Sequence, residues 1–131
     1  MNILGIGVDI IDNSRIKQSL KNSHFIKRIF TNTEIAEAKK IKNNIAFYSK
    51  RYAAKEAFSK SIGTGFRDNF NFKDISVIND KQGKPLFVIN EKIKKIIKKQ
   101  FKTTTFNFFL SISDEKKYSV AYVILQKNEN R

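Results

Sequence analysis

The sequence predicts an α+β fold in which an antiparallel sheet packs against one long helix and several short helices. The chain begins with a strand-like run of β-branched residues, continues with helical patterns to about residue 62, and then returns to mostly strand patterns. Helices and strands that are grouped along a chain, rather than strictly alternating, favour an antiparallel sheet. With 131 residues, of which 40% are hydrophobic, we expect one domain that spans residues 1–131.

The first predicted strand covers residues 3–11 and is rich in isoleucine and valine. Because side chains alternate along a strand, one face is apolar and carries Leu4, Ile6, Val8 and Ile10. The opposite face carries Gly5, Gly7 and Asp9, so it is nearly bare backbone that leads to a carboxylate. Two interpretations are open. Either a helix or strand packs over the glycines and Asp9 simply ends the strand, or Asp9 lies at the floor of a cleft.

Short helices are predicted to follow this strand. Residues 12–14 are typical capping residues, and the segment 15–30 after them is amphipathic with a cationic outer face. Thr31 and Glu34 have the spacing of a capping box, which would open a further helix that ends near residue 41.

The longest predicted helix covers residues 46–62 and contains alanines that favour helix and permit close packing. Gly63 is expected to end it. Glu56 and Lys60 are four residues apart and share one face, which Tyr52 joins. A carboxylate and an ammonium placed together suit a metal-bound phosphate, since the carboxylate holds the cation and the lysine faces the anion. The alternative is a solvated surface pair that contributes only about 0.2–0.5 kcal/mol.

The second half of the chain predicts four strands and one helix. The strands are residues 74–78, 85–89, 105–113 and 118–126, and the helix is residues 90–100. Both faces of the last strand are largely apolar, which indicates a central position in the sheet or a subunit interface.

Composition narrows the class of protein and of partner. A net charge of +14 predicts attraction to polyanions such as nucleic acid, anionic membrane or an acidic protein, although abundant lysine can also reflect compositional bias. The chain has no cysteine, and it contains no apolar run long enough to cross a membrane. Its first residues do not have the pattern of a secretion signal, so we expect a cytoplasmic protein.

Four separated segments together resemble holo-(acyl-carrier-protein) synthase, the small bacterial class of 4′-phosphopantetheinyl transferase. They are Gly-Ile-Gly-Val-Asp-Ile at 5–10 followed by Arg15 and Ile16, Arg-Ile-Phe-Thr at 28–31 followed by Glu34, Arg-Tyr-Ala-Ala-Lys-Glu-Ala at 51–57 leading to Gly-Thr-Gly at 63–65, and Leu-Ser-Ile-Ser at 110–113. The resemblance extends over about residues 3–126, and the first and third segments are the most specific. It implies a 4′-phosphopantetheinyl transferase-like fold.

The resemblance also implies an activity. Members of this family move the 4′-phosphopantetheine arm of coenzyme A onto a serine of acyl carrier protein, and adenosine 3′,5′-bisphosphate leaves. They use Mg²⁺ and are typically homotrimers with active sites between subunits. A basic module that binds nucleic acid without catalysis is the alternative, but the sequence has no recognised motif for nucleic acid and its lysines are spread along several helices.

Site residues are assigned from the matching motifs. Asp9 and Glu56 match the magnesium-binding carboxylates, and with Lys60 they form the expected catalytic group. The residues expected to contact coenzyme A are Lys55, Lys60, Gly63, Thr64 and Gly65. Arg15 and Arg28 are expected to engage the acidic carrier protein.

The chemistry of these residue types agrees with the resemblance. Transfer from a diphosphate requires mainly positioning and charge neutralisation, and Mg²⁺ is often held by one or two carboxylates together with substrate phosphates. The proton of the incoming serine could pass to Glu56 or to a water molecule beside the metal, and both possibilities are open. One departure from the family pattern is Asp114, which stands where the family usually has histidine, so we do not include it in the site.

Overall fold

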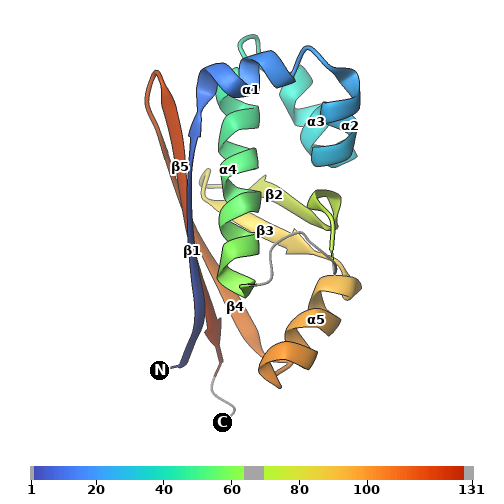
Figure 1. Ribbon diagram of the computed structural model, residues 1–131, viewed down its shortest axis with the longest axis vertical. Coiled ribbons are helices and arrows are strands. Elements are labelled where there is room, and N and C mark those ends of the chain that lie inside the picture. The colour runs from blue at the N-terminus through green and yellow to red at the C-terminus, as the bar shows by residue number, and fades with distance from the viewer. Residues whose placement is uncertain (1, 64–69, 129–131) are drawn as a thin grey trace.

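The computed structural model describes residues 2–63 and 70–128, and its elements follow the predicted order (Figure 1). Figure 1 shows α4 running alongside β1, with α1, α2 and α3 grouped near the first turns of α4 and α5 near its last turns. The elements are β1 (Asn2–Asp12), α1 (Asn13–Ser19), α2 (Ser23–Ile29), α3 (Asn32–Lys39), α4 (Ile45–Ile62), the 3₁₀ turn η1 (Phe72–Asp74), β2 (Ile75–Asn79), β3 (Pro85–Ile89), α5 (Glu91–Phe101), β4 (Phe106–Asp114) and β5 (Tyr118–Lys127).

Two antiparallel sheets confirm the predicted fold class. One has the strand order β1-β5-β4, and the other is the β2–β3 hairpin. The central strand is β5, as its apolar faces predict. Its inner face carries fully buried side chains such as Val123 and Leu125, whereas Tyr122 on its outer face is 44% exposed.

The long helix α4 is buried on most of its circumference. Ala53, Ala54 and Ala57 are fully buried and pack with β5 residues in one hydrophobic cluster. Phe58 and Ile62 belong to a second cluster, which includes residues of α5 and β2. The small side chains therefore let the sheet approach α4 closely, while the large ones fill the space beside it.

Helix α4 rests directly on the backbone of β1 at Gly5 and Gly7. A Cβ atom at Gly5 would overlap the carbonyl oxygen of Ser61, and one at Gly7 would overlap the carbonyl oxygen of Ala57. A helix therefore packs over the two glycines, as the first interpretation holds, but Asp9 does not end the strand, because β1 continues to Asp12. Asp9, the next residue on this face of β1, comes to lie beside α4 as a result of the same packing.

The prediction that Leu4 shares a face with Ile6 and its neighbours is wrong. The pairing of β1 with β5 shifts register between Ile3 and Gly5, so Leu4 occupies a β-bulge. Its side chain packs against the cluster that contains Phe58 and Ile62.

The amphipathic segment 15–30 forms most of two short helices, α1 and α2. After α1 ends, the side chain of Asn22 accepts a hydrogen bond from the backbone nitrogen of His24 at 2.9 Å and opens α2. The capping box at the start of α3 is confirmed. Glu34 N donates to Thr31 Oγ1 at 3.2 Å, and Thr31 N donates to Glu34 Oε1 at 2.9 Å.

We expect Gly7→Ala to lower the free energy of unfolding by about 2 kcal/mol or more, because the added methyl group meets helix backbone rather than a mobile side chain. Urea denaturation measures this change. Gly83→Ala is the matched control. Gly83 has a φ of +86° but no neighbouring atom within 4 Å of an added Cβ, so that variant should lose only about 1 kcal/mol. Equal losses at the two positions would contradict the close approach of α4 to β1.

Candidate active site

Asp9 and Lys60 meet where α4 lies against β1. Lys60 Nζ donates to Asp9 Oδ1 at 3.1 Å and to the carbonyl oxygen of Val8 at 3.0 Å. The Asp9 side chain is only 15% exposed, whereas that of Lys60 is 54% exposed. Asp9 Oδ2 is buried and has no hydrogen-bond partner among the residues that the structure describes. One carboxylate oxygen is therefore satisfied by an ammonium while the other is free to accept a ligand.

Glu56 lies one helical turn before Lys60 and is electrostatically coupled to Asp9. Burial, and then the nearby charge of Asp9, raises the pKa of the Glu56 carboxyl above its usual value. Tyr52 lies one turn earlier again, and burial together with the charge of Glu56 raises the pKa of its hydroxyl to about 12. Burial also raises the pKa of Asp9, although the hydrogen bond from Lys60 opposes this effect. Asp9, Glu56 and Lys60 are called the acidic site below.

The acidic site suits a divalent cation that has oxygen ligands. Burial raises the pKa of both carboxyl groups, and Lys60 supplies a single ammonium to offset two negative charges. The unpartnered Asp9 Oδ2 is a further indication that a ligand is accepted here. Within residues 2–63 and 70–128, no group of three or more histidine, aspartate or glutamate side chains could hold a metal ion. Two protein carboxylates are nevertheless typical of Mg²⁺, which keeps several water molecules.

Arg15 lies at a small cavity next to the acidic site. This cavity of about 220 Å³ is lined by residues of β1, α1, α2 and α4, including Arg15, Phe25 and Tyr52. Helix α1 is held in place by the buried Asn13, whose Nδ2 donates to the carbonyl oxygens of Glu115 and Lys116 at 3.1 and 3.2 Å. The turn between β4 and β5 therefore fixes the start of the helix that carries Arg15.

Arg28 lies on α2 at an adjoining hollow of about 300 Å³, together with His24 and Phe25. Its positive charge lowers the pKa of Tyr52, in opposition to burial and Glu56. The two arginines predicted to engage the carrier protein are thus both close to Tyr52.

Gly63 ends α4 in the left-handed conformation, with a φ of +92°, as the sequence predicts for a helix stop. Thr64 and Gly65, which the sequence assigns to coenzyme A contact, lie outside the described residues. Asp114 is exposed at the end of β4, opposite Ser119 of β5.

The prediction that Lys55 contacts coenzyme A is wrong. Its side chain is completely buried, and Nζ donates to Glu34 Oε1 at 2.6 Å, to the carbonyl oxygen of Ile29 at 2.8 Å and to that of Phe72 at 3.1 Å. An ammonium has three N–H donors, so none is left for a phosphate. Successive helix residues point about 100° apart, which explains why Lys55 faces the interior while Glu56 faces Asp9.

Glu34 completes a buried network around Lys55. Its Oε1 also accepts from Thr31 N, and its Oε2 accepts from Val77 N at 2.9 Å. Burial lowers the pKa of Lys55, and the charge of Glu34 opposes that effect. The pair therefore joins α3, α4 and β2 and links them to the end of α2 and to η1.

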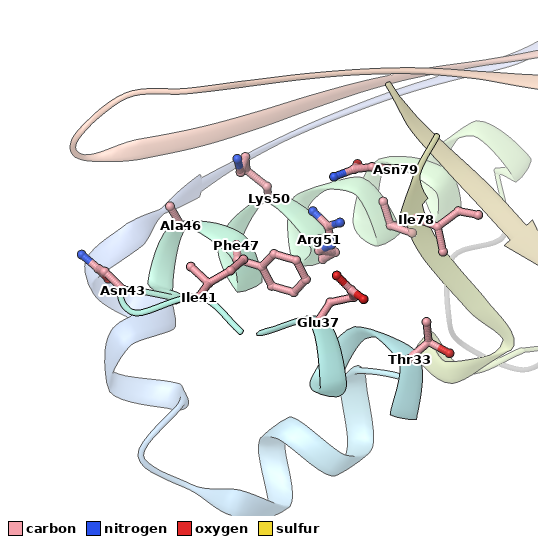
Figure 2. A pocket seen from close by; sticks show the side chains of 11 residues that line it. Thr33, Glu37, Ile41, Asn43, Ala46, Phe47, Lys50, Arg51, Ile78 and Asn79 are labelled. Atoms are coloured by element: carbon pink, nitrogen blue, oxygen red, sulfur yellow. The ribbon is translucent and has the colours of Figure 1, made fainter. Parts of the chain in front are cut away.

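A third cavity lies between α3, α4 and β2 and was not predicted as a site from the sequence (Figure 2). It has a volume of about 480 Å³. Arg51 is 5% exposed, its guanidinium carbon lies 3.9 Å from the centroid of the Phe47 ring, and its Nε has no partner among the described residues. Figure 2 shows Arg51 and Glu37 pointing toward the same space. A buried guanidinium at a cavity can bind an anion. The only signal in the sequence is that Arg51 begins the third motif.

Comparisons with known proteins identify similar chains. A family model described as the 4′-phosphopantetheinyl transferase superfamily matches residues 5–123. A holo-[acyl-carrier-protein] synthase of Pelagibacter ubique is 74% identical over 127 residues, which cover 97% of this chain and 99% of that protein. The crystal structure of holo-[acyl-carrier-protein] synthase from Neisseria meningitidis matches with a TM-score of 0.86 and 35% identity, covering 95% of this chain and 99% of that one. A synthase from Bacillus anthracis in complex with CoA (3′,5′-ADP) matches with a TM-score of 0.81 and 38% identity, covering 98% of this chain and 100% of that one.

We expect Lys55→Met to lower the free energy of unfolding by about 3–5 kcal/mol, because it leaves Glu34 buried without its counter-ion. Urea denaturation at neutral pH measures the loss. Lys40→Met is the control, since Lys40 forms a surface pair with Glu37 in which both side chains are more than half exposed, and it should lose less than about 1 kcal/mol. A Lys55→Met protein as stable as the control would show that the buried pair is dispensable.

Proposed function

Because the chain belongs to the 4′-phosphopantetheinyl transferase superfamily, we infer that it acts as a holo-(acyl-carrier-protein) synthase. It transfers the 4′-phosphopantetheine arm of coenzyme A to a serine of apo acyl carrier protein and releases adenosine 3′,5′-bisphosphate. One observation assigns this function to particular residues. The side chains of Asp9, Glu56 and Lys60 lie together where β1 contacts α4.

Residues 1–131 constitute the catalytic domain, and the protein works in the cytoplasm. None of the helices described is long and apolar enough to cross a membrane.

Asp9 and Glu56 would hold Mg²⁺. The support for this assignment is the unpartnered Asp9 Oδ2 and the mutual electrostatic effect of the two carboxylates, which a divalent cation would relieve. The ion supplies neutralisation of the charge on the coenzyme A diphosphate. The two carboxylates would hold the ion next to the helix face that carries Lys60.

Glu56 and Lys60 have complementary tasks in the transfer. The serine hydroxyl of the carrier attacks the β-phosphorus of coenzyme A, the bond from that phosphorus to the bridging oxygen breaks, and adenosine 3′,5′-bisphosphate takes the electron pair. Glu56 would accept the serine proton, because its partly buried carboxylate lies on the helix face that carries Lys60 and next to Asp9. Lys60 is largely exposed, so its ammonium can turn from Asp9 to the leaving phosphate.

Arg15 and Arg28 receive the acidic carrier protein. Both are exposed. Arg15 lines a cavity together with Tyr52, which lies one helical turn before Glu56, and Arg28 lines a hollow that shares Phe25 with that cavity. A carrier bound there would bring its serine close to the acidic site. Exposed cationic side chains of this kind steer an acidic partner and raise its association rate.

We also propose that the protein is a homotrimer. The support is the outer face of the β1-β5-β4 sheet, which leaves large apolar side chains exposed on all three strands. They include Ile6 (56%), Val8 (50%) and Ile10 (64%) of β1, Phe109 (46%) of β4 and Tyr122 (44%) of β5. Apolar area of this extent on one face is typical of a subunit interface.

The function is tested by incubating the protein with coenzyme A, apo acyl carrier protein and Mg²⁺ and weighing the carrier by mass spectrometry. The parent protein should add one phosphopantetheine to the carrier. Asp9→Ala and Glu56→Ala should each reduce the rate at least about 100-fold with little change in unfolding midpoint, because they remove metal ligands rather than core contacts. Glu91→Ala removes a carboxylate from a surface pair and is the control. A folded parent protein that leaves the carrier unmodified would refute the function.

Arg15→Ala should raise the KM for the carrier several-fold and leave the KM for coenzyme A nearly unchanged, because Arg15 contacts the protein partner alone. Steady-state kinetics with each substrate varied in turn measures the two constants. Raising the ionic strength should reduce the difference in KM for the carrier between Arg15→Ala and the parent protein, because salt screens the attraction between Arg15 and the acidic carrier. Lys99→Ala, on α5, provides the charge-matched control. An equal rise in both KM values would contradict the assignment of Arg15 to carrier binding.

A further inference from the structure

We propose that Lys60 is an internal cation that competes with the divalent ion for Asp9, and that it moves to the diphosphate when the co-substrate binds. Metal and coenzyme A would then bind cooperatively, and the free enzyme would hold the metal weakly. This inference rests on the proposed function, since it assumes that the acidic site binds both.

The contacts of Lys60 place its charge inside the acidic site. Its Nζ donates to Asp9 Oδ1 at 3.1 Å and to the carbonyl oxygen of Val8 at 3.0 Å. A cation that binds the free Oδ2 of the same carboxylate would therefore lie within a few ångströms of the ammonium. The lysine charge also acts on Glu56, the second carboxylate of the site. Lys60 thus offsets part of the negative charge of both carboxylates and so lowers their affinity for a metal ion.

The Lys60 side chain is exposed enough for its ammonium to move away from Asp9. Its side chain is 54% exposed, and in the described part of the chain its ammonium has only Asp9 and Val8 as hydrogen-bond acceptors. This contrasts with Lys55 on the same helix, which is buried and fully bonded. A partly exposed lysine with one N–H unused can exchange Asp9 for a phosphate oxygen at low cost.

The size of the effect follows from Coulomb's law. A charge of +1 about 5 Å from a charge of +2, screened by a solvent-rich environment, weakens metal binding by a factor of about ten or more. A diphosphate that attracts the ammonium removes this repulsion and adds its own oxygens as metal ligands. Because coupling between two ligands is reciprocal, bound metal must increase the affinity for coenzyme A by the same factor.

The test compares Lys60→Met with Lys60→Arg and Lys99→Met. Binding of Mn²⁺, which takes the same oxygen ligands as Mg²⁺, is measured by electron paramagnetic resonance in the absence of nucleotide. Lys60→Met should bind Mn²⁺ about tenfold more tightly than the parent, because the competing charge is gone. Lys60→Arg keeps the charge and should stay within about twofold of the parent. Lys99→Met loses a lysine on α5 and should not differ from the parent.

A second measurement separates this role from a merely structural one. In the presence of Mg²⁺, Lys60→Met should bind coenzyme A about tenfold more weakly, opposite in sign to its change in metal affinity. A structural defect would weaken both. Unchanged or weaker Mn²⁺ binding by Lys60→Met would overturn the inference. The proposed function would still stand if the parent protein modified the carrier in the mass assay, so the two failures are distinguishable.

Discussion

The direct contact between the backbone of β1 and that of α4 is the constraint on which the acidic site depends. At Gly5 and Gly7 the helix lies so close that no side chain fits between the two elements. Asp9 follows on the same face of β1, and Lys60 on α4 reaches it with a 3.1 Å hydrogen bond. A larger residue at Gly7 would separate the helix from the strand and so move Lys60 and Glu56 away from Asp9.

Burial sorts the charges of α4 into two classes with different roles. Lys55 is buried with Glu34 in a network that satisfies every donor of its ammonium, and this network holds α4 against α3 and β2. Glu56, the next residue, belongs to the acidic site, and there burial and the charge of Asp9 raise its pKa. A glutamate kept in such surroundings destabilises the fold above the pH at which it ionises, and a bound cation would relieve this cost.

Surface features of the molecule agree with a protein that works together with other chains. The outer face of the three-stranded sheet exposes isoleucine, valine and aromatic side chains, while Arg15 and Arg28 lie at two hollows that Phe25 lines in common. The first feature suits other copies of the chain and the second suits an acidic partner. The many lysines elsewhere on the helices add to the net charge of +14 without gathering at the site.

The sequence by itself determined the order of the elements, the capping box at Thr31, the stop at Gly63 and the pairing of Glu56 with Lys60 on one helix face. These features depend on neighbours along the chain, whose spacing can be read directly. Only the tertiary structure decided that Leu4 leaves the strand alternation, that Lys55 is buried with Glu34, and that Arg51 lies at a cavity. Each of these depends on contacts between residues far apart in the chain, and a helix periodicity does not reveal which of two adjacent charged residues will find its partner in the interior.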